Sequence, residues 1–197
     1  MGTDIILNHG KKPYSQWQRS MNLLKIKTKK IEKIFHKTIK QKVSCLGVDT
    51  ASRTGWARIT TGKVWCEIDY GFIEVKTPDK YFKYNRYIEA FKSILRPEDI
   101  IVIEETYYGR NVKVFQLLSR LGAFVYTLAH LINVPKIYFI LATTCRKQLG
   151  FPGNLKKPII HKMFKERLDL DIDDEDVIDA IMLALTGILE EQTLENA

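Results

Sequence analysis

The chain has 197 residues, of which 45% are hydrophobic, and a formal net charge of +8. This length and composition predict one ordinary domain with a sizeable core and an appendage. Apolar runs stay short of the roughly 18 residues that a membrane span needs, and the N-terminus lacks the order of a secretion signal, so we expect an intracellular chain. Cys45, Cys66 and Cys145 form no CxxC pair, which excludes a disulfide framework or a zinc ribbon.

The positive charge is concentrated at the N-terminus. Residues 1–42 contain 11 lysines and arginines against Asp4 and Glu32, whereas residues 43–197 contain 20 basic and 21 acidic residues. A cationic arm on a nearly neutral body favours a polyanionic partner, and nucleic acid fits better than a membrane, which would also require apolar anchors. The alternative is that the lysines merely keep a tail solvated.

Within this arm, residues 1–13 are expected to be loosely ordered. Residues 15–40 have apolar side chains at roughly helical spacing with lysines between them, which predicts a basic amphipathic helix. The apolar stripe, which we expect to cover either the body or a second copy of the chain, is made of Met21, Leu24, Ile31, Ile34, Phe35 and Ile39.

From residue 43 the pattern changes to that of an α/β domain. Period-2 alternation and tight turns predict three antiparallel strands, and two later near-continuous apolar runs predict strands buried on both faces. The strands are expected at 43–49, 56–60, 64–75, 100–105 and 136–141, and the helices at 81–95, 111–132, 143–149, 157–168 and 173–190. This order predicts a mixed five-stranded sheet flanked by helices.

Carboxylates occur where two of these buried strands end. Asp49 ends the first strand, and Glu104 and Glu105 end the fourth. An unpaired acid at such a position carries a desolvation cost, but it is a good ligand for a hard cation. Because Glu104 and Glu105 alternate, only one of them can face Asp49, and periodicity alone does not choose between them.

The last helix contributes two further acids. Asp176 and Asp179 have i,i+3 spacing, which puts both on one face of a helix that then becomes strongly apolar. Other acids in this run favour the helix dipole, and Asp173 and Asp174 lie close enough to leave the fourth ligand open. An all-carboxylate set predicts Mg²⁺ or Mn²⁺, because zinc would prefer His or Cys.

Three ordered motifs carry a resemblance to a known family. LGVDTASRTGWARI, IVIEETYYGRN and DDEDVIDAIMLAL resemble the RuvC Holliday junction resolvases of the ribonuclease H-like superfamily, over about residues 43–190. The resemblance implies a homodimer that cuts four-way DNA junctions with two divalent ions per active site, one generating the nucleophile and one stabilising the leaving oxygen. It selects Glu104 over Glu105, and it implies the metal-binding and catalytic set Asp49, Glu104, Asp176 and Asp179.

The same resemblance implies a set of DNA contacts. Tyr107 occupies the place of an aromatic side chain that inserts at the junction crossover, with Tyr108 as its substitute, and the segment LGFPGNLKKPI resembles a loop that leads to a phosphate-binding lysine. His161 is expected at the surface. The candidate DNA contacts are Tyr107, Tyr108, Arg110, Arg146, Lys147, Lys156 and Lys157.

Two features depart from the family pattern. The first motif has DTAS where a Pro-Gly pair is usual, and typical bacterial members lack the arm of residues 1–42. The arm suits a divergent resolvase of a phage or other mobile genome, in the cytoplasm of a bacterial or infected host cell and near its nucleoid. We expect the arm, a nuclease domain over residues 43–191 and a tail over 192–197.

Three alternatives stay open. Another ribonuclease H-like enzyme could cut forks, flaps or RNA–DNA hybrids, and a junction-binding protein could have lost its chemistry. A sugar-kinase or actin-like ATPase has a similar first phosphate loop, but it needs a second nucleotide-binding lobe for which the chain leaves no room. We therefore expect no nucleotide cofactor and no membrane partner.

Overall fold

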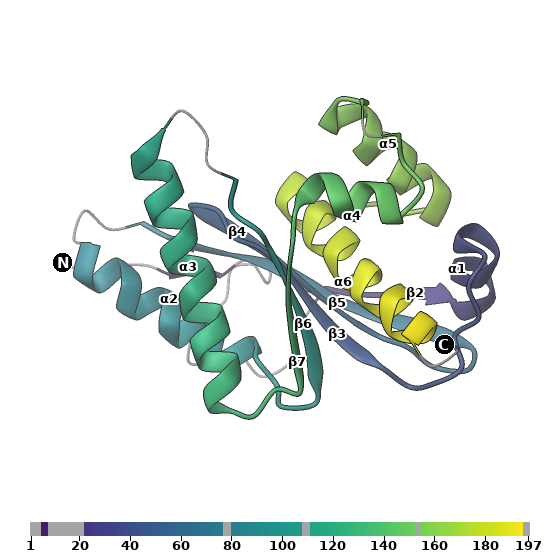
Figure 1. Cartoon of the computed structure of the whole chain (residues 1–197), viewed down its shortest axis with the longest axis horizontal. Helices are drawn as coiled ribbons and strands as arrows, with labels where there is room; N and C mark the ends of the chain where they lie inside the picture. Colours follow the sequence, from purple (N-terminus) through teal and green to yellow (C-terminus); the bar gives the residue numbers. More distant parts are fainter. Residues whose placement is uncertain (1–4, 8–21, 77–79, 108–110, 153, 195–197) are drawn as a thin grey trace.

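The computed structural model describes residues 5–7, 22–76, 80–107, 111–152 and 154–194, and these form a sheet with helices on both faces (Figure 1). The strands are β1 (Ile5–Leu7), β2 (Asn22–Lys27), β3 (Ser44–Asp49), β4 (Arg53–Thr60), β5 (Trp65–Val75), β6 (Asp99–Glu104) and β7 (Lys136–Ile140). The helices are α1 (Thr28–Phe35), α2 (Lys80–Ile94), α3 (Val112–Leu131), α4 (Ala142–Gln148), α5 (Lys157–Leu168) and α6 (Glu175–Leu194).

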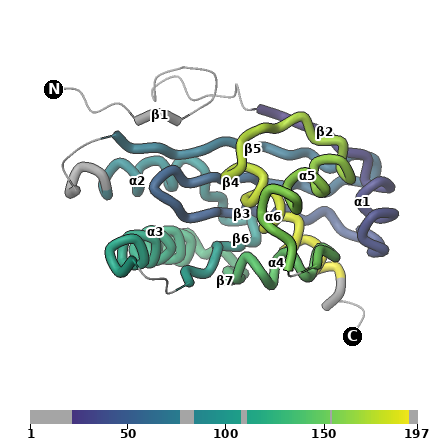
Figure 2. The backbone as a smooth tube through the Cα atoms, turned by 90° about the horizontal axis from the view of Figure 1, so that it is seen from above, coloured from purple at the N-terminus to yellow at the C-terminus, as the bar shows by residue number. Residues whose placement is uncertain are grey.

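Five of the strands form the predicted mixed sheet. β3, β4 and β5 pair antiparallel, β6 pairs parallel to β3, and β7 pairs parallel to β6. The order across the sheet is β5-β4-β3-β6-β7, as Figure 2 shows. The α/β class and the five-stranded core are confirmed, and the arm adds β1 and β2 to the outer edge of β5.

The central strands are buried on both faces, which explains their near-continuous apolar sequences. Leu46 and Val48 of β3 share a core cluster with α2 and α3, whereas Cys45 of β3 and Val102 of β6 belong to the cluster beneath α6. Side chains alternate between the faces of a strand, so each strand supplies both cores. Figure 1 shows the strands in the centre, with α2 and α3 on one side and α6 on the other.

Glycines allow α6 to lie unusually close to the sheet. A Cβ at Gly47 would lie 2.1 Å from the carbonyl oxygen of Ala180, and one at Gly55 would lie 2.1 Å from that of Asp176. Farther along the helix, a Cβ at Gly187 would lie 2.6 Å from Cys45 Sγ. These contacts leave no room for any side chain, so they fix α6 along β3 and β4 and determine where its acids lie.

The arm differs from its prediction. The helix expected over residues 15–40 is wrong for residues 22–27, which form β2, and α1 comprises only Thr28–Phe35. Leu24 and Ile26 face the core, and they alternate with exposed neighbours. The open edge of β5 offers backbone hydrogen bonds to residues 22–27, and this pairing overrides their local propensity for a helix. The spacing of apolar residues in the arm could not reveal this partner. Residues 15–21 of the predicted helix lie outside the described residues.

Among the described helices, α3 is long and apolar enough to cross a membrane by length and composition alone. This finding differs from the expectation that no segment would reach that threshold. Leu121, Val125 and Ala129 of α3 are buried in the core cluster shared with α2 and the sheet, and core helices meet the same criterion. Only 22% of the apolar stretch of α3 is buried, so packing on the sheet accounts for one stripe of the helix and leaves an apolar outer face.

A buried ion pair joins the end of β4 to the start of β6. The guanidinium of Arg58 donates to both carboxylate oxygens of Asp99, with Nε 3.0 Å from each and Nη2 2.8 Å from Oδ2. Ser44 Oγ donates to Asp99 Oδ1 at 2.6 Å, and Arg58 also donates to the carbonyl oxygen of Ile94. Both charges are almost fully buried, so loss of either one alone would leave the other as an uncompensated buried charge.

Candidate active site

Two candidate acids meet at the carboxyl ends of neighbouring parallel strands. In the β3–β6 ladder Val48 lies opposite Ile103, so the next residues, Asp49 and Glu104, end the two strands side by side. Their carboxyl groups are hydrogen-bonded to each other, and Asp49 is 8% exposed. Glu105 points elsewhere and is exposed, so the strand register makes the choice that periodicity left open.

Helix α6 brings the other two acids to the same end of the sheet. Asp49 lies opposite Gly55 in the β3–β4 ladder, and the backbone of Asp176 packs directly on Gly55. Asp179, one turn later, is buried and within electrostatic reach of Asp49. Asp49, Glu104 and Asp179 therefore lie together, while the side chain of Asp176 has another partner.

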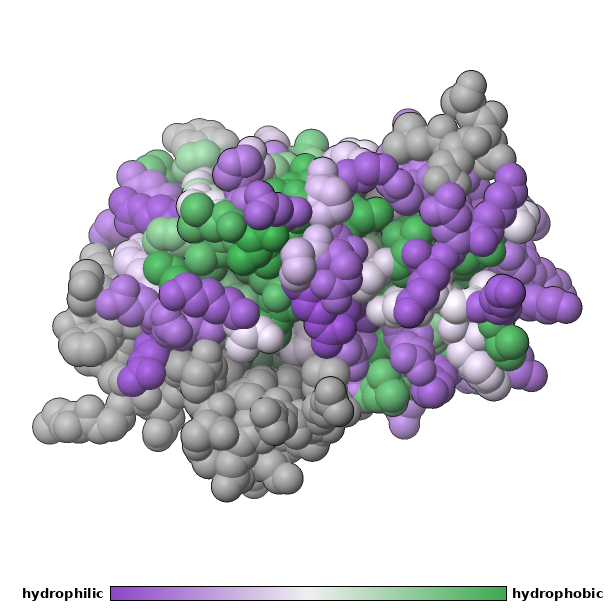
Figure 3. Space-filling view, turned by 90° about the horizontal axis from the view of Figure 1, so that it is seen from below, coloured by the Kyte–Doolittle hydropathy of each residue, from purple (hydrophilic) through white to green (hydrophobic). Residues whose placement is uncertain are grey.

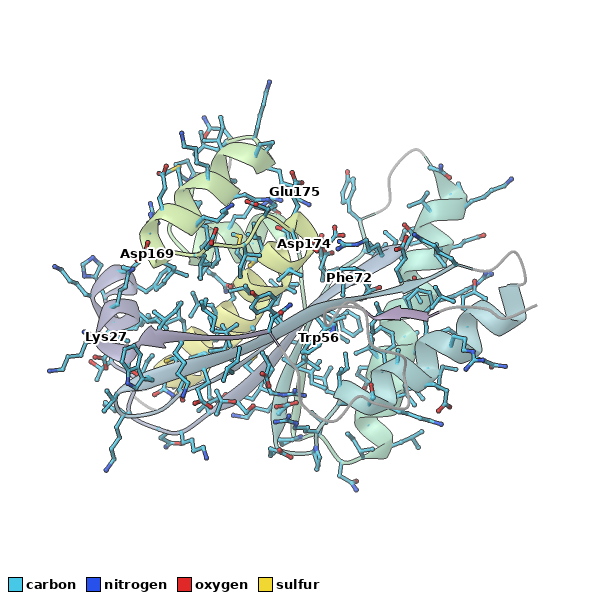
Figure 4. The ribbon with its side chains drawn as sticks, turned by 180° about the vertical axis from the view of Figure 1, so that it is seen from behind. Lys27, Trp56, Phe72, Asp169, Asp174 and Glu175 are labelled. Atoms are coloured by element: carbon cyan, nitrogen blue, oxygen red, sulfur yellow. The ribbon has the colours of Figure 1, made fainter. Side chains whose placement is uncertain are left out.

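That partner is Arg53, at the start of β4. Its guanidinium donates to the carboxylates of Asp174 and Asp176 and lies 3.5 Å from the centre of the Phe72 ring. Figure 4 shows Asp174 and Phe72 close together at the start of α6. The hydrogen bonds from Arg53 to Asp174 and Asp176 raise the arginine's pKa further, so it is a permanent cation that holds Asp176 away from the other acids.

Asp179 is held by two basic side chains from α5. Lys157 Nζ lies 2.6 Å from Asp179 Oδ2, and His161 Nε2 lies 2.8 Å from Oδ1. The expectation of a surface histidine is wrong, because His161 is only 4% exposed. Nothing in the sequence around His161 indicates a contact with Asp179, because only the packing of α5 on α6 brings the two side chains together.

The acids of this site carry opposite pKa shifts. Burial, the hydrogen bond to Glu104 and the negative charges of Glu104 and Asp179 raise the pKa of Asp49 to about 10. Burial would also raise the pKa of Asp179, but hydrogen bonds from His161 and Lys157 outweigh it and lower the pKa below its ordinary value. Without a cation the Asp49 carboxyl thus keeps its proton, and a cation bound beside Asp49 and Glu104 would favour the ionised carboxylates.

Two solved structures of Thermus thermophilus RuvC are similar to this chain. One is RuvC itself, with a TM-score of 0.65, and the other is RuvC in complex with a Holliday junction substrate, with a TM-score of 0.62. Each is 17% identical, and the alignment covers 77% of this chain and 96% of the RuvC chain. The chain has a RuvC-like fold. No protein-family model and no curated protein matches it, so the likeness is one of structure.

In this RuvC-like fold the acids have the right chemistry for a hard divalent cation. Asp49, Glu104 and Asp179 offer carboxylate oxygens, the ligands that Mg²⁺ and Mn²⁺ prefer, and burial together with the neighbouring acids raises the pKa of Asp49 despite the positive charge of Lys157. Within the described residues, no three acidic, histidine or cysteine side chains are already arranged as a metal-binding group. A bound cation would require Asp179 to exchange Lys157 for the metal, and Asp176 to leave Arg53.

The other candidate ligands have partners of their own. Asp173 is exposed and lies 2.8 Å from Lys165, on the far side of the turn before α6. Asp174 accepts a hydrogen bond from the backbone nitrogen of Val177 at 3.3 Å and is paired with Arg53. Asp174 therefore caps the first turn of α6, which leaves Asp176 as the better candidate for a fourth ligand.

Some of the predicted DNA contacts lie next to the candidate acids, and others are exposed on the neighbouring elements. Arg146 of α4 lines a small cavity with Glu104 and Asp179, while Lys147 is exposed on the same helix. Lys156 is exposed at the N-terminal cap of α5, and Lys157 reaches Asp179. Tyr107, 81% exposed, follows β6 beyond Glu104. Tyr108 and Arg110 lie outside the described residues.

The raised pKa of Asp49 predicts how stability depends on pH. The pKa of Asp49 is about 10 in the native state, whereas the ordinary pKa of the side chain, which applies to the unfolded chain, is 3.8. Protonation therefore stabilises the native state fully below pH 3.8, and this contribution is lost as the pH rises towards 10. Urea unfolding in EDTA from pH 5 to 9 is expected to give falling stability, with a shallower slope in Asp49→Asn. Equal slopes would contradict the prediction.

Proposed function

We propose that the protein is a divalent-metal-dependent endonuclease that resolves four-way DNA junctions. The observation that carries this proposal is the convergence of Asp49, Glu104 and Asp179 from two strand ends and a helix. Buried acids in mutual repulsion lower stability, and a chain that retains them has a functional use for them. A RuvC of the same fold has been solved with a Holliday junction substrate, which suggests the class of DNA.

The residues that would hold the cations are Asp49, Glu104 and Asp179, joined by Asp176. Two divalent cations, when bound, supply an activated nucleophile and stabilise charge on the leaving oxygen. This chain's own residues would hold the scissile phosphate: Lys157, once released from Asp179, can turn to a phosphate oxygen, and Arg146 lies beside Glu104 and Asp179 in the small cavity that these three residues help to line. Burial lowers the pKa of Lys157, but the carboxylates of Asp179 and Asp49 outweigh that effect and raise it, so the lysine stays charged.

Junction recognition is assigned to the exit of β6. The side chain of Tyr107 is almost fully exposed and lies three residues beyond Glu104. An exposed aromatic ring at this distance from the acids can stack on a base that is unpaired at the crossover. The exposed lysines Lys147 and Lys156 would contact the phosphates of the duplex arms, which makes binding salt-dependent.

A homodimer is also proposed, because two symmetric nicks need two active sites. The outer face of α3 and the neighbouring edge strand β7 expose large apolar side chains, and the α2–α3 side of the molecule carries an apolar area (Figure 3). Contiguous apolar surface of this kind is typical of a self-association interface. The exposed side chains on these two elements are Val112, Val114, Tyr126, Leu131 and Phe139.

The substrate is tested by comparing nicking of a four-way junction, a fork, a flap, an RNA–DNA hybrid and linear duplex, each with Mg²⁺ and with EDTA. We expect paired nicks in the junction that require Mg²⁺ and much slower cutting of linear duplex. Preferential cutting of forks, flaps or hybrids would favour the alternative ribonuclease H-like nuclease. Junction binding with no cutting of any substrate would favour a binding protein without chemistry.

His161 is predicted to position Asp179 for metal binding. His161 Nδ1 is buried and has no partner among the described residues, so the hydrogen is assigned to Nε2, which donates to Asp179. His161→Ala is expected to weaken Mn²⁺ binding by about 10-fold to 100-fold, measured by calorimetry, with nicking partly recovered at high metal concentration. His161→Gln can still donate a hydrogen bond and should restore part of the affinity. Unchanged Mn²⁺ affinity in His161→Ala would contradict this role.

A further inference from the structure

A groove lies at the end of the sheet that is remote from the candidate acids. It has a volume of about 430 Å³ and lies between the linker that precedes β3 and the β4–β5 turn. β3 begins at Ser44, beside this groove, and ends at Asp49, a separation of roughly 17 Å along the strand. In Figure 4, Lys27 at this end of the sheet lies far from Asp174 at the other. The groove is therefore separate from the proposed nuclease site.

The groove is preformed by hydrogen bonds between its two walls. Thr61 Oγ1 donates to the carbonyl oxygen of Gln41 at 2.8 Å and accepts from the backbone nitrogen of Val43 at 2.7 Å. On the other side, Thr28 donates from its backbone nitrogen to the carbonyl oxygen of Val64 at 3.0 Å and from Oγ1 to that of Gly62 at 2.6 Å. The arm thus holds the β4–β5 turn in place, which lowers the entropic cost of binding.

The lining carries an excess of positive charge. Lys40, Lys42 and Lys63 line the groove, and Glu67 is its acidic member. Glu67 is already paired with Lys25 at 2.8 Å, whereas Lys42 and Lys63 are exposed and form no ion pair with any described residue. Nearby, the arm from residue 22 to residue 42 contains eight lysines and a single acid, Glu32. The groove therefore favours a polyanion.

An exposed tryptophan lies beside these lysines. Trp65 is 43% exposed at the start of β5, although its indole is among the most favourable side chains to bury. Lys27 Nζ lies 5.8 Å from the centre of its ring, so the ring is flanked by a cation. A cationic groove with a stacking aromatic ring is the pattern by which proteins bind single-stranded nucleic acid. Duplex bases stack on one another, so the ring favours unpaired bases.

We propose that this groove binds single-stranded nucleic acid, with phosphates contacting Lys42 and Lys63 and a base stacked on Trp65. The arm would thus have a specific function, because the linker after α1 forms one wall of the groove and Thr28, at the start of α1, anchors the β4–β5 turn that forms the other. The inference does not depend on the proposed nuclease activity, since it uses none of the candidate acids. A single strand exposed at a branch point is the form of DNA that would engage it.

The test measures fluorescence anisotropy of a labelled oligothymidylate and of a labelled duplex with the full chain in EDTA, at several salt concentrations. Trp65→Ala is expected to weaken oligothymidylate binding by about 10-fold, while Trp65→Phe, which keeps a ring, stays within about 3-fold. Log affinity falls with log salt, and for Lys42→Glu combined with Lys63→Glu the magnitude of this negative slope is expected to be smaller by about 1.4, because two phosphate contacts are lost. Lys92→Glu, on α2 and paired with Glu89, serves as the charge control and should bind like the parent chain.

Three results would overturn the proposal. Trp65→Ala could bind oligothymidylate as tightly as the parent chain, which would exclude stacking. The lysine variant and Lys92→Glu could lose equal affinity, which would make the effect one of net charge. The parent chain could bind duplex more tightly than oligothymidylate through these same residues, which would make the groove a duplex site. Thermal melting of each exposed-residue variant verifies that it is folded, and nicking assays do not enter the test.

Discussion

Asp49→Asn is expected to abolish Mg²⁺-dependent nicking of four-way junctions while leaving junction binding intact. Asn keeps the shape of Asp49 but cannot supply a carboxylate beside Glu104, so a cation there loses a principal ligand. We expect a loss of about 1,000-fold or more, equivalent to roughly 4 kcal/mol in the barrier. Nicking is measured on a labelled junction, and binding is measured by anisotropy in Ca²⁺.

The matched control for this variant is Asp171→Asn. Asp171 is exposed and lies before α6, so the same chemical change is made outside the cluster and should leave nicking unchanged. Retained Mg²⁺-dependent nicking in Asp49→Asn would remove Asp49 from the site. Loss of junction binding together with nicking would assign Asp49 a structural role instead.

Arg58→Met is expected to cause the largest loss of stability of any single change considered. It leaves the carboxylate of Asp99 buried with Ser44 as its remaining side-chain hydrogen-bond donor among the described residues, and it removes the donor to the carbonyl oxygen of Ile94. Breaking a buried pair in this way costs about 3–5 kcal/mol. For a chain of this size, the melting temperature should fall by roughly 10 °C. Urea unfolding in EDTA measures the free energy directly.

A double change separates the ion pair from simple packing. Arg58→Met combined with Asp99→Leu removes both charges, and we expect it to recover most of the stability, because the buried carboxylate is no longer uncompensated. Arg96→Met is the control for loss of an exposed arginine and should change stability by less than about 0.5 kcal/mol. A double variant no more stable than Arg58→Met would show that shape, and not charge, governs this position.

Local patterns predicted most of the core fold. β3 and β6 are near-continuous apolar runs bounded by turn residues, and α3 and α6 have long apolar stretches with clear ends, so burial on two faces or along a helix was readable. The arm was misjudged because Leu24 fits the helical stripe that continues at Ile31, whereas only the short alternation of Leu24 with Ile26 indicates a strand. The deciding factor was the unpaired edge of β5, which lies about 40 residues farther along the chain.

The sequence by itself determined the order of the elements and the residues at their ends, including acids that no local structure requires. Only the tertiary structure decided which of them meet: the β3–β6 register selected Glu104, Arg53 took Asp176, and His161 reached Asp179. Hydrophobic periodicity is a property of neighbours in the chain, so it can be read locally. Partners in an ion pair, a ladder or a cation site are set by how distant elements pack, and no local pattern contains that information.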